Sequence, residues 1–462
     1  MKIDLPDFVL EILKRFTQAS FEIYIVGGAV RDILTNREVD DWDFTTNATP
    51  EEILKIFPDG FYDNVFGTVG ISHSSSPNPY EITTFRREFD YADHRRPSKV
   101  EWGKTLEEDL SRRDFTINAM ALRAVQSTKY TENRSTKNSV LCTMDLIDPF
   151  SGQKNLNKKL IKAVGNANDR FIEDALRMMR AIRIAAELDF TIEEKTLEAI
   201  RKNATLINQI AKERVKEELF KLLSSQYPYE GMLIFRNSGL LGQVLPELEK
   251  CFGVEQKSPG RHHVYDVGTH QLMSLKSCKS EDPLIRFATL IHDIGKPATY
   301  KKLPTGVITF YNHEVVSTKI AENIADRLKF SNKEKEKLLT LVRWHQFTVD
   351  ERQTDSAIRR FIRNVGIENI ADILSLRVAD RLGGGATETS WRLEEFKKRL
   401  IEVQKEPFSI RDLKIDGNDV MKVLRLRSGP KVGEILEKLF DEVVKKKIPN
   451  EKNILIKRLK EF

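Results

Sequence analysis

Two neighbouring stretches decide the fold: Tyr24-Ile-Val-Gly-Gly-Ala-Val-Arg-Asp32 and Val39-Asp-Asp-Trp-Asp-Phe-Thr45. The apolar residues 24–26 predict a buried strand that ends at two glycines. Gly27 and Gly28 carry no side chains, so the backbone there can close on a bulky anionic ligand. The helix predicted to follow presents its positive N-terminal end to phosphate. The first stretch therefore indicates a phosphate-binding turn.

The second stretch supplies candidate metal ligands. Asp41 and Asp43 lie two residues apart, and on a strand such residues project from the same face. Magnesium prefers carboxylate oxygens together with substrate phosphates, and two such ions stabilise both the attacking and the leaving oxygen of a phosphoryl displacement. Alone, a glycine pair is usually a turn and an Asp-x-Asp a solvated loop. Together, one short helical turn apart, they favour nucleotidyl transfer.

The motifs Gly27-Gly-Ala-Val-Arg-Asp32 and Asp41-Trp-Asp43 resemble the head-domain signature of the bacterial class II tRNA nucleotidyltransferase and poly(A) polymerase family, which includes the CCA-adding enzymes. The resemblance implies an α+β chain in which a small polymerase-beta-like sheet head precedes an all-helical neck, an HD domain and a helical tail. It also implies that the two aspartates are catalytic and hold Mg²⁺, and that Gly28 and Arg31 hold the triphosphate.

The length of 462 residues exceeds one domain core, so two to four domains are expected. We predict a nucleotidyltransferase head at 1–147, a nucleotide-selecting and RNA-binding neck at 148–225, a helical body with the HD domain at 226–385 and a tRNA-binding tail at 386–462. The net charge of +6 permits a polyanionic partner without demanding one.

Three widely spaced cysteines without a Cys-x-x-Cys motif indicate neither a disulfide framework nor a zinc knuckle. The N-terminus lacks the apolar core of a signal peptide, and no apolar run approaches the roughly 20 residues that cross a bilayer. We therefore expect a cytoplasmic protein without a membrane partner.

Several elements of the head follow from local patterns. Residues 5–20 predict an amphipathic helix, and Thr49-Pro-Glu-Glu52 predicts a capped helix start. Residues 67–73 and 80–85 read as two strands of one sheet, where Glu81 either faces the aspartates as a third carboxylate or is an ordinary exposed residue. The polar residues 125–140 predict a surface loop without chemistry.

Residues 85–97, Phe-Arg-Arg-Glu-Phe-Asp-Tyr-Ala-Asp-His-Arg-Arg-Pro, are dense in charge and aromatic rings, which is typical of a mobile, solvent-facing loop. In the resembled family this region is similar to the flexible loop that allows the switch from CTP to ATP. Because the loop has full length here, the resemblance favours an enzyme that adds CCA, or A alone, over one that adds only CC.

The run Arg112-Arg-Asp-Phe-Thr-Ile-Asn-Ala119 resembles the second motif of the family. Two arginines beside an aspartate are either a solvated helix start or suited to a nucleotide, with Arg113 as a phosphate clamp and Asp114 as an acceptor for ribose hydroxyls. The turn at 148–152 is interpreted as a joint between two domains. Asn155 stands where the family usually carries an acid.

A helix predicted over residues 171–183 carries Glu173, Asp174, Arg177, Arg180 and Arg183 on one face. The alternative is a solvated helix held by ion pairs. The Glu-Asp-x-x-Arg pattern matches the nucleotide-selecting motif of the family. A carboxylate at position 174 accepts from the exocyclic amine of cytosine or adenine while the arginine at 177 donates to the ring nitrogen, and uracil or guanine would leave buried groups unpaired. The arginines at 180 and 183 are placed to reach the triphosphate, whereas residues 213–220 are interpreted as neck packing.

Six of the eight histidines fall between residues 262 and 345. His270, the pair His292-Asp293 and Asp380 follow the order H…HD…D, which resembles the HD phosphohydrolase superfamily and implies a divalent metal at those four positions. Imidazole with carboxylate suits manganese, nickel, cobalt or zinc better than calcium. His313 and His345, not counted in the four, either extend the site, cradle phosphate or serve in the core.

The tail contains Gly429-Pro-Lys-Val-Gly-Glu-Ile-Leu436, which looks like part of the region that grips the tRNA elbow in the family. The sequence therefore predicts template-independent addition of CCA to tRNA 3′ ends from CTP and ATP, with possible hydrolysis at the HD site. Three alternatives stay open: an A-adding or poly(A)-adding relative, an HD phosphohydrolase whose head merely binds nucleotide, and a non-catalytic tRNA-binding protein. The sequence does not fix the oligomeric state.

Overall fold

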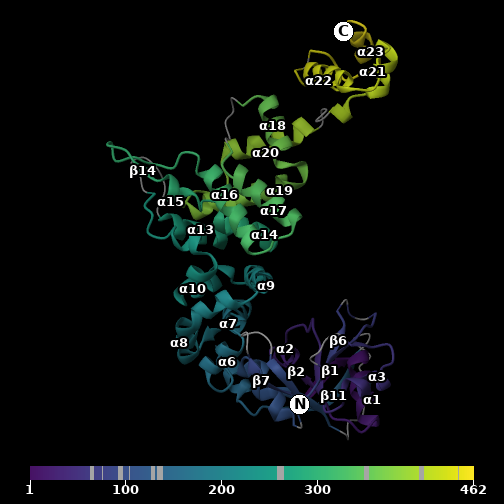
Figure 1. Ribbon diagram of the computed structural model, residues 1–462, viewed down its shortest axis with the longest axis vertical. Helices are drawn as coiled ribbons and strands as arrows, with labels where there is room; N and C mark the ends of the chain where they lie inside the picture. The colour runs from purple at the N-terminus through teal and green to yellow at the C-terminus, as the bar shows by residue number, and fades with distance from the viewer. Residues whose placement is uncertain are drawn as a thin grey trace. The chain divides into compact units, whose positions relative to one another are not determined.

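A computed structural model describes the chain except for residues 63–66, 75, 77, 92–96, 104, 126–130, 133–138, 257–264, 348–352, 405–409 and 446 (Figure 1). The chain forms two compact units, Met1–Glu249 and Lys250–Phe462. The finer division into head, neck, body and tail stays a prediction.

A mixed sheet forms the centre of the head. Its strands, in spatial order, are β1 (Lys2–Pro6), β11 (Ser139–Ile147), β9 (Ala121–Ala124), β2 (Ile23–Val26), β3 (Asp43–Thr46), β6 (Tyr80–Thr84), β5 (Thr68–Ile71) and β4 (Phe61–Tyr62), and β10 (Thr131–Glu132) also pairs with β11. The prediction of a buried strand before the glycines is confirmed, because β2 is buried at every position between β9 and β3. β2 ends at Gly27, and α2 (Gly28–Leu34) starts directly after it.

The first residues differ from the prediction of one helix over 5–20. Residues 2–6 form the edge strand β1, and the helix α1 is Asp7–Gln18. Ile3 and Leu5 are buried while Lys2 and Asp4 are exposed, a period of two that suits a strand with one buried face. The partner strand β11 is more than a hundred residues away, so the local helical pattern could not reveal this pairing.

Two predicted loops contain strands. β7 (Arg86–Tyr91) and β8 (Pro97–Trp102) pair as an antiparallel hairpin, so the loop prediction is wrong for those residues, and residues 92–96 lie outside the described part. Similarly, β10 and the start of β11 fall inside the predicted loop at 125–140. Charged, polar composition does not prevent pairing, because main-chain hydrogen bonds form a ladder regardless of side-chain polarity.

The capped helix start is confirmed. Thr49 and Glu52 form a capping box at α3 (Pro50–Ile56), with Pro50 in the first turn. The other short elements of the head are α4 (Leu106–Ser111) and the 3₁₀ turn η1 (Thr116–Asn118).

The rest of the first unit is mainly helical. It comprises α5 (Gly152–Asn157), α6 (Ala167–Glu173), α7 (Leu176–Leu188), α8 (Glu194–Asn203), η2 (Ala204–Gln209), α9 (Lys212–Ser224), α10 (Pro228–Asn237), α11 (Leu240–Val244) and α12 (Pro246–Glu249), with a small pair of strands, β12 (Leu160–Ile161) and β13 (Thr191–Ile192). Buried Asn155 donates a hydrogen bond to the Thr116 hydroxyl at 2.9 Å, so it ties α5 to the head motif.

The predicted continuous helix over 171–183 is interrupted at Asp174. This residue has extended backbone angles, and its Oδ1 accepts the backbone N–H of Leu176 at 3.0 Å. A short acidic side chain that captures a nearby N–H competes with the helical hydrogen bonds and starts a new helix. As a result α6 ends at Glu173, and the arginines continue on α7.

The second unit is almost entirely helical. Its elements are α13 (Val267–Ser277), α14 (Pro283–Ile291), α15 (Lys296–Thr299), α16 (His313–Arg327), α17 (Asn332–Trp344), α18 (Asp355–Val365), η3 (Ile367–Asn369), α19 (Ile370–Gly383), α20 (Trp391–Gln404), η4 (Ile410–Asp412), α21 (Gly417–Leu424), α22 (Pro430–Val444) and α23 (Lys452–Leu459), with β14 (Lys301–Lys302) and β15 (Ile308–Thr309). α13 packs against α14 and α19. The last three helices enclose an apolar core of their own that includes Val420, Leu439 and Leu455.

Within the described residues, no helix combines the length and the apolar character that crossing a bilayer requires.

Candidate active site and metal-binding cluster

A cavity of about 690 Å³ opens in the first unit and is lined by residues of both head and neck. All ten residues that the sequence predicts for catalysis and nucleotide binding line it: Gly28, Arg31, Asp41, Asp43, Arg113, Asp114, Asp174, Arg177, Arg180 and Arg183. The structure thus brings together four motifs that are far apart in the sequence. The geometry supports a single site for a large, highly charged ligand.

The glycine turn lies against the carboxylate of Asp43. Gly27 has φ of +72°, and a Cβ atom there would lie 3.1 Å from Arg113 Nη1 and 3.2 Å from Asp43 Oδ2. Glycine is therefore favoured at this position both by the positive φ and by the lack of room for a Cβ atom. Because Val26 pairs with Asp43 in the ladder, the sheet itself places this aspartate beside the turn.

The two aspartates of the predicted metal site share the cavity wall, although only one is on the strand. β3 begins at Asp43, and Asp41 lies just before it, where its Oδ1 accepts a hydrogen bond from Asn78 at 2.7 Å. Burial raises the pKa of Asp43, and the neighbouring Asp41 carboxylate raises it further, while Arg113 opposes the shift. Two neighbouring carboxylates form a donor set suited to a hard divalent cation. The register partner of Asp43 on β6 is the exposed Glu81.

A buried acid that the sequence analysis missed fixes the two arginines of the second motif. Asp109 is fully buried, and its carboxylate lies 2.6 Å from Arg112 Nη2 and 3.2 Å from Arg113 Nη2. Burial alone would raise the pKa of Asp109, but the two guanidinium groups outweigh it and lower the pKa. The spacing of three and four residues within a helical turn is a signal that could have revealed this pairing.

Asp114 connects the head to the neck. Its Oδ2 lies 2.7 Å from Arg180 Nη2, and its Oδ1 accepts from the backbone N–H of Phe115 and from the amide of Asn118. Burial raises the pKa of this carboxyl, but Arg180 outweighs it and the pKa falls to about 2. Both oxygens accept hydrogen bonds from the protein, so binding of ribose hydroxyls by Asp114 stays a prediction.

Arg31 is similarly held within the cavity wall. Its guanidinium donates to both carboxylate oxygens of Asp32, at 2.9 and 2.8 Å, and to the amide oxygen of Asn118 at 3.1 Å. The side chain is therefore fixed on the same wall as Gly28.

The predicted base-reading pair is held in place by neighbours. Asp174 Oδ2 accepts from Arg214 Nη2 at 2.9 Å, and Arg177 donates to Glu173 at 2.8 Å and to the carbonyl of Arg112 at 2.9 Å. Arg214 belongs to α9, so the interpretation of residues 213–220 as packing alone misses this contact. Planar groups held this way keep a fixed orientation toward the cavity.

Arg183 is anchored by acids on two helices. It donates to Glu187 at 2.8 and 2.9 Å and also pairs with Glu218 on α9. Burial lowers the pKa of Arg183, but the two glutamates outweigh it and the net shift is upward. Its contact with a triphosphate stays a prediction.

A second constellation lies in the helical body. The four residues predicted from the order H…HD…D converge: His270 Nε2 lies 3.4 Å from Asp293 Oδ2 and 3.2 Å from Asp380 Oδ1, and His292 Nε2 lies 3.2 Å and 3.6 Å from the same atoms. The two imidazole Nε2 atoms are 3.3 Å apart. The ligand atoms from α13, from the residues after α14 and from α19 therefore meet around one point.

His313 and His345 belong to the same cluster. Their Nε2 atoms lie 3.1 and 3.5 Å from Asp293 Oδ1, the oxygen that faces away from the first pair of histidines. Asp293 thus stands between two groups of possible ligands, which share it. Lys296 contacts the same carboxylate at 2.5 Å and donates to the side chain of Gln256 at 2.7 Å.

The histidine tautomers suit a metal. In His292, His313 and His345, Nδ1 lies 2.7–2.8 Å from the backbone carbonyl three residues earlier. A carbonyl only accepts, so each Nδ1 carries a hydrogen, and Nε2 is the ring atom that faces the Asp293 carboxylate. Two acceptors facing each other repel unless a proton or a metal ion lies between them. A hydrogen-bonded Nδ1 with a free Nε2 is the usual state of a histidine ligand.

The charges of the cluster are strongly coupled. Burial would lower the pKa of His292, but the carboxylate of Asp293 outweighs it and the pKa rises to about 10. Burial also opposes ionisation of Asp293, yet Lys296 and the histidines hold its pKa well below the ordinary value. The pKa of His345 is lowered by burial. The residues present fit a divalent cation, which would replace the protons that balance these carboxylates.

Comparison with known proteins covers most of the chain. The family model of the poly A polymerase head domain matches residues 23–162, the model of the probable RNA and SrmB-binding site of polymerase A matches 189–252, and the model of tRNA nucleotidyltransferase domain 2 matches 308–459. A CCA-adding enzyme of Staphylococcus haemolyticus is 31% identical over 455 residues, which cover 97% of this chain and 96% of the relative.

Other relatives agree. A CCA-adding enzyme of Limosilactobacillus reuteri is 46% identical over 242 residues, covering 52% of this chain and 55% of that relative. The crystal structure of the Bacillus stearothermophilus CCA-adding enzyme in complex with CTP is similar with a TM-score of 0.68 at 27% identity, and the match covers 98% of this chain and 96% of that one. The match spans both units, and the cavity carries the motifs of the resembled family. The chain therefore belongs to the family of CCA-adding enzymes, the tRNA nucleotidyltransferases.

Proposed function

We propose that this protein adds C, C and A to the 3′ end of tRNA, using CTP and ATP and no nucleic-acid template. One observation carries the proposal: the two aspartates of the head and the Asp174–Arg177 edge of the neck line the same cavity. Chemistry and base selection can therefore act on one bound nucleotide. Membership of the family and the likeness to an enzyme solved with CTP support the same substrate class.

CCA-adding nucleotidyltransferases use a divalent metal. In this chain Asp41 and Asp43 would hold Mg²⁺, which when bound stabilises charge on the attacking and leaving oxygens. Gly28, Arg31 and Arg113 bind the triphosphate. The 3′-hydroxyl of tRNA attacks the α-phosphate, the α–β bond breaks, and pyrophosphate leaves, so each turn adds one nucleotide.

The neck selects the base. Asp174 accepts a hydrogen bond from the exocyclic amine that cytosine and adenine share, and Arg177 donates to the adjacent ring nitrogen. Arg214 keeps Asp174 in a fixed orientation, because the guanidinium holds one of its oxygens. Arg180 and Arg183 contribute positive charge toward the triphosphate.

The decisive experiment uses tRNA that ends before CCA, incubated with CTP, with ATP and with both. We expect addition of CC with CTP alone and of full CCA only with both nucleotides. Addition of A with ATP alone would instead identify an A-adding or poly(A)-adding relative. A chain carrying Asp41→Asn and Asp43→Asn is the control and should add nothing while still binding tRNA.

We further propose that the histidine–aspartate cluster binds a divalent metal and hydrolyses phosphate esters. His270, His292, Asp293 and Asp380 would hold the ion, and His313 and His345 extend the site on the other oxygen of Asp293. Imidazole with carboxylate favours manganese, nickel, cobalt or zinc, which when bound lower the pKa of a bound water. The convergence of the histidine Nε2 atoms on the carboxylate of Asp293 is the observation that favours this second function.

This second proposal is tested on the purified chain with each of the four metals. We expect His292→Ala to lose the metal, measured by elemental analysis, and to lose hydrolysis of a 2′,3′-cyclic nucleotide, while it keeps CCA addition. His73→Ala, a histidine of the head, is the matched control and should keep both. A wild-type chain that retains no metal would refute the proposal.

A further inference from the structure

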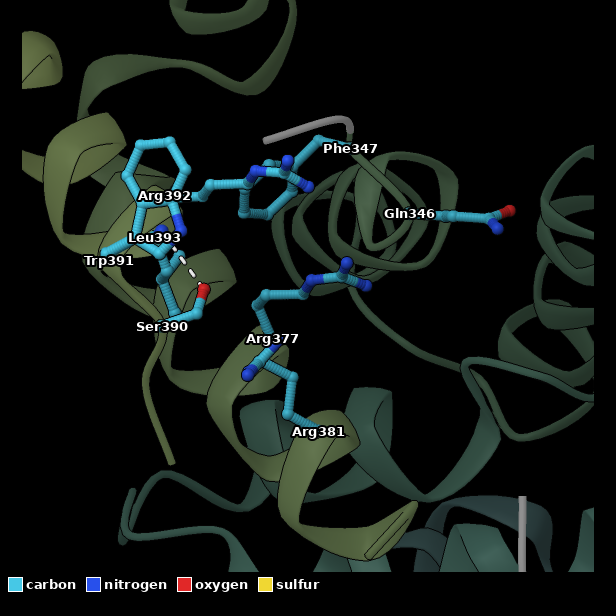
Figure 2. Close-up of a pocket in the computed structure, with 8 residues that line it drawn as sticks. All are labelled: Gln346, Phe347, Arg377, Arg381, Ser390, Trp391, Arg392 and Leu393. Carbon is cyan, nitrogen blue, oxygen red and sulfur yellow. Dashed lines mark hydrogen bonds between the residues drawn. The ribbon is translucent and has the colours of Figure 1, made fainter. Parts of the chain in front are cut away.

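A pocket of about 620 Å³ lies beside α19 and the start of α20 in the second unit (Figure 2). Figure 2 shows Arg377 and Arg381 on one helix with Trp391 and Arg392 across from them, and Phe347 also lines the pocket. The volume falls within the range of about 300–1,000 Å³ that holds small ligands in proteins. None of the residues assigned to nucleotidyl transfer lines this pocket.

The charged side chains that line the pocket are all positive. Arg377, Arg381 and Arg392 line the pocket, and none of the described residues that line it is acidic. Arg381 is held in place, because it donates to the backbone carbonyls of Thr387 at 3.2 Å and Thr389 at 3.4 Å. Guanidinium groups with a fixed orientation are well suited to phosphate, which they bind with two parallel hydrogen bonds.

The pocket also offers aromatic surface. The side chain of Trp391 is 61% exposed, although an indole ring is largely apolar. Phe347 is packed against Phe361 and Phe396, and the guanidinium of Arg377 lies 5.6 Å from its ring centre. An exposed aromatic ring beside arginines is the combination on which proteins stack a nucleic-acid base while they bind its phosphate.

One carboxylate connects the pocket to the metal-binding cluster. Asp380 Oδ1 lies 3.2 Å from His270 Nε2, and Asp380 Oδ2 lies 3.1 Å from Arg377 Nη1. A phosphate bound by Arg377 would therefore lie next to the metal ligands. Arg377, which lines the pocket, therefore also contacts a residue of the candidate hydrolytic centre.

We propose that this pocket binds a nucleoside phosphate, either free or as the terminal residue of an RNA, and presents its phosphate to the histidine–aspartate cluster. The base stacks on Trp391, and Arg377 and Arg381 bind the phosphate. The presentation step rests on the hydrolytic function proposed for the cluster, whereas binding in the pocket does not.

Binding is measured by calorimetry on the full chain after metal removal, so that no turnover occurs. An Arg113→Ala and Asp174→Ala background weakens binding in the cavity of the head, because it removes one proposed phosphate contact and one proposed base contact there. The probes are adenosine 3′-monophosphate and a short RNA that ends in a 3′-phosphate. We expect Arg381→Ala and Trp391→Ala to weaken binding of both probes at least tenfold, whereas Lys398→Ala, an exposed residue on the same helix α20, leaves it unchanged.

Arg381→Lys and Trp391→Phe keep the proposal testable if an alanine variant does not fold, which circular dichroism checks. Each should weaken binding less than its alanine counterpart. Tighter binding of the RNA than of the nucleotide identifies an RNA end as the source, and equal binding identifies free nucleotides. Unchanged binding in all pocket variants, or no binding to the wild type, overturns the proposal. Pocket-dependent binding without hydrolysis under any metal would refute only the function of the cluster.

Discussion

The two charged sites of this protein are built in opposite ways. In the cavity of the first unit, most cationic and acidic groups are paired with each other and spread around an open space of about 690 Å³. In the cluster of the second unit, His270, His292 and Asp293 are almost completely buried and their ligand atoms lie within 3.5 Å.

The difference reflects the size of what each site binds. A nucleoside triphosphate and an RNA end need room and many weak contacts, and the fixed ion pairs orient the walls without filling the space. A metal ion needs a few donors at short distance in a dry site. Because the two sites share no residue, a substitution in one of them should leave the other unchanged.

The largest effect is expected from Asp43→Asn. Removing a metal ligand should lower the rate of CCA addition about 10³-fold or more, corresponding to roughly 4 kcal/mol of transition-state stabilisation. Hydrolysis at the cluster should stay within about twofold of the wild type. Measuring the rates of CCA addition and of hydrolysis on one preparation tests this prediction. A parallel loss of both rates would show that the two sites are not independent.

The Asp114–Arg180 pair should stabilise the fold in a pH-dependent way. Because the pKa of Asp114 falls to about 2 in the folded chain, its contribution is present above the unfolded pKa of about 4 and disappears as the pH falls through 2. The expected size is about 2 kcal/mol.

Urea unfolding of the wild type and of Asp114→Asn measures this contribution. The difference between the two free energies of unfolding should be largest at neutral pH and should shrink below pH 4. A difference that does not change with pH would mean that ionisation of the Asp114 carboxyl does not stabilise the folded chain.

A smaller effect is expected from Arg214→Ala, which frees one oxygen of Asp174. Discrimination against UTP and GTP should fall about tenfold, equivalent to roughly 1.4 kcal/mol, because the reading carboxylate loses its fixed orientation. Incorporation of each single nucleotide measures this. Lys216→Ala, on the same helix but outside the cavity lining, is the matched control and should keep the wild-type selectivity.

The smallest effect is expected from Thr49→Ala, a residue that belongs to neither the cavity lining nor the histidine–aspartate cluster. Loss of the capping box should lower the free energy of unfolding by about 1 kcal/mol. Both activities should be unchanged at a temperature where the chain is folded. A change in either rate would show that the stability of the head and the geometry of a site are coupled.

Local patterns predicted part of the fold correctly, and the ten residues predicted for catalysis and nucleotide binding line one cavity, although their roles stay predictions. The strand before Gly27 and the cap at Thr49 depend on neighbouring residues, and the structure contains both. The strand β1 and the hairpin of β7 and β8 were missed because pairing depends on a partner strand rather than on local composition. The break at Asp174 was missed because helical periodicity says nothing about a side chain that captures an N–H group.

The sequence by itself determined which residue types are present for the chemistry: two aspartates, a glycine turn, a set of arginines and a histidine–aspartate series. Only the tertiary structure decided how they are held. Asp109 fixes the arginines of the head, Arg214 fixes Asp174, and Asp293 lies between two pairs of histidines. The physical reason is that charge pairing acts over a few ångströms in space, and residues far apart in the chain come that close only when the core packs.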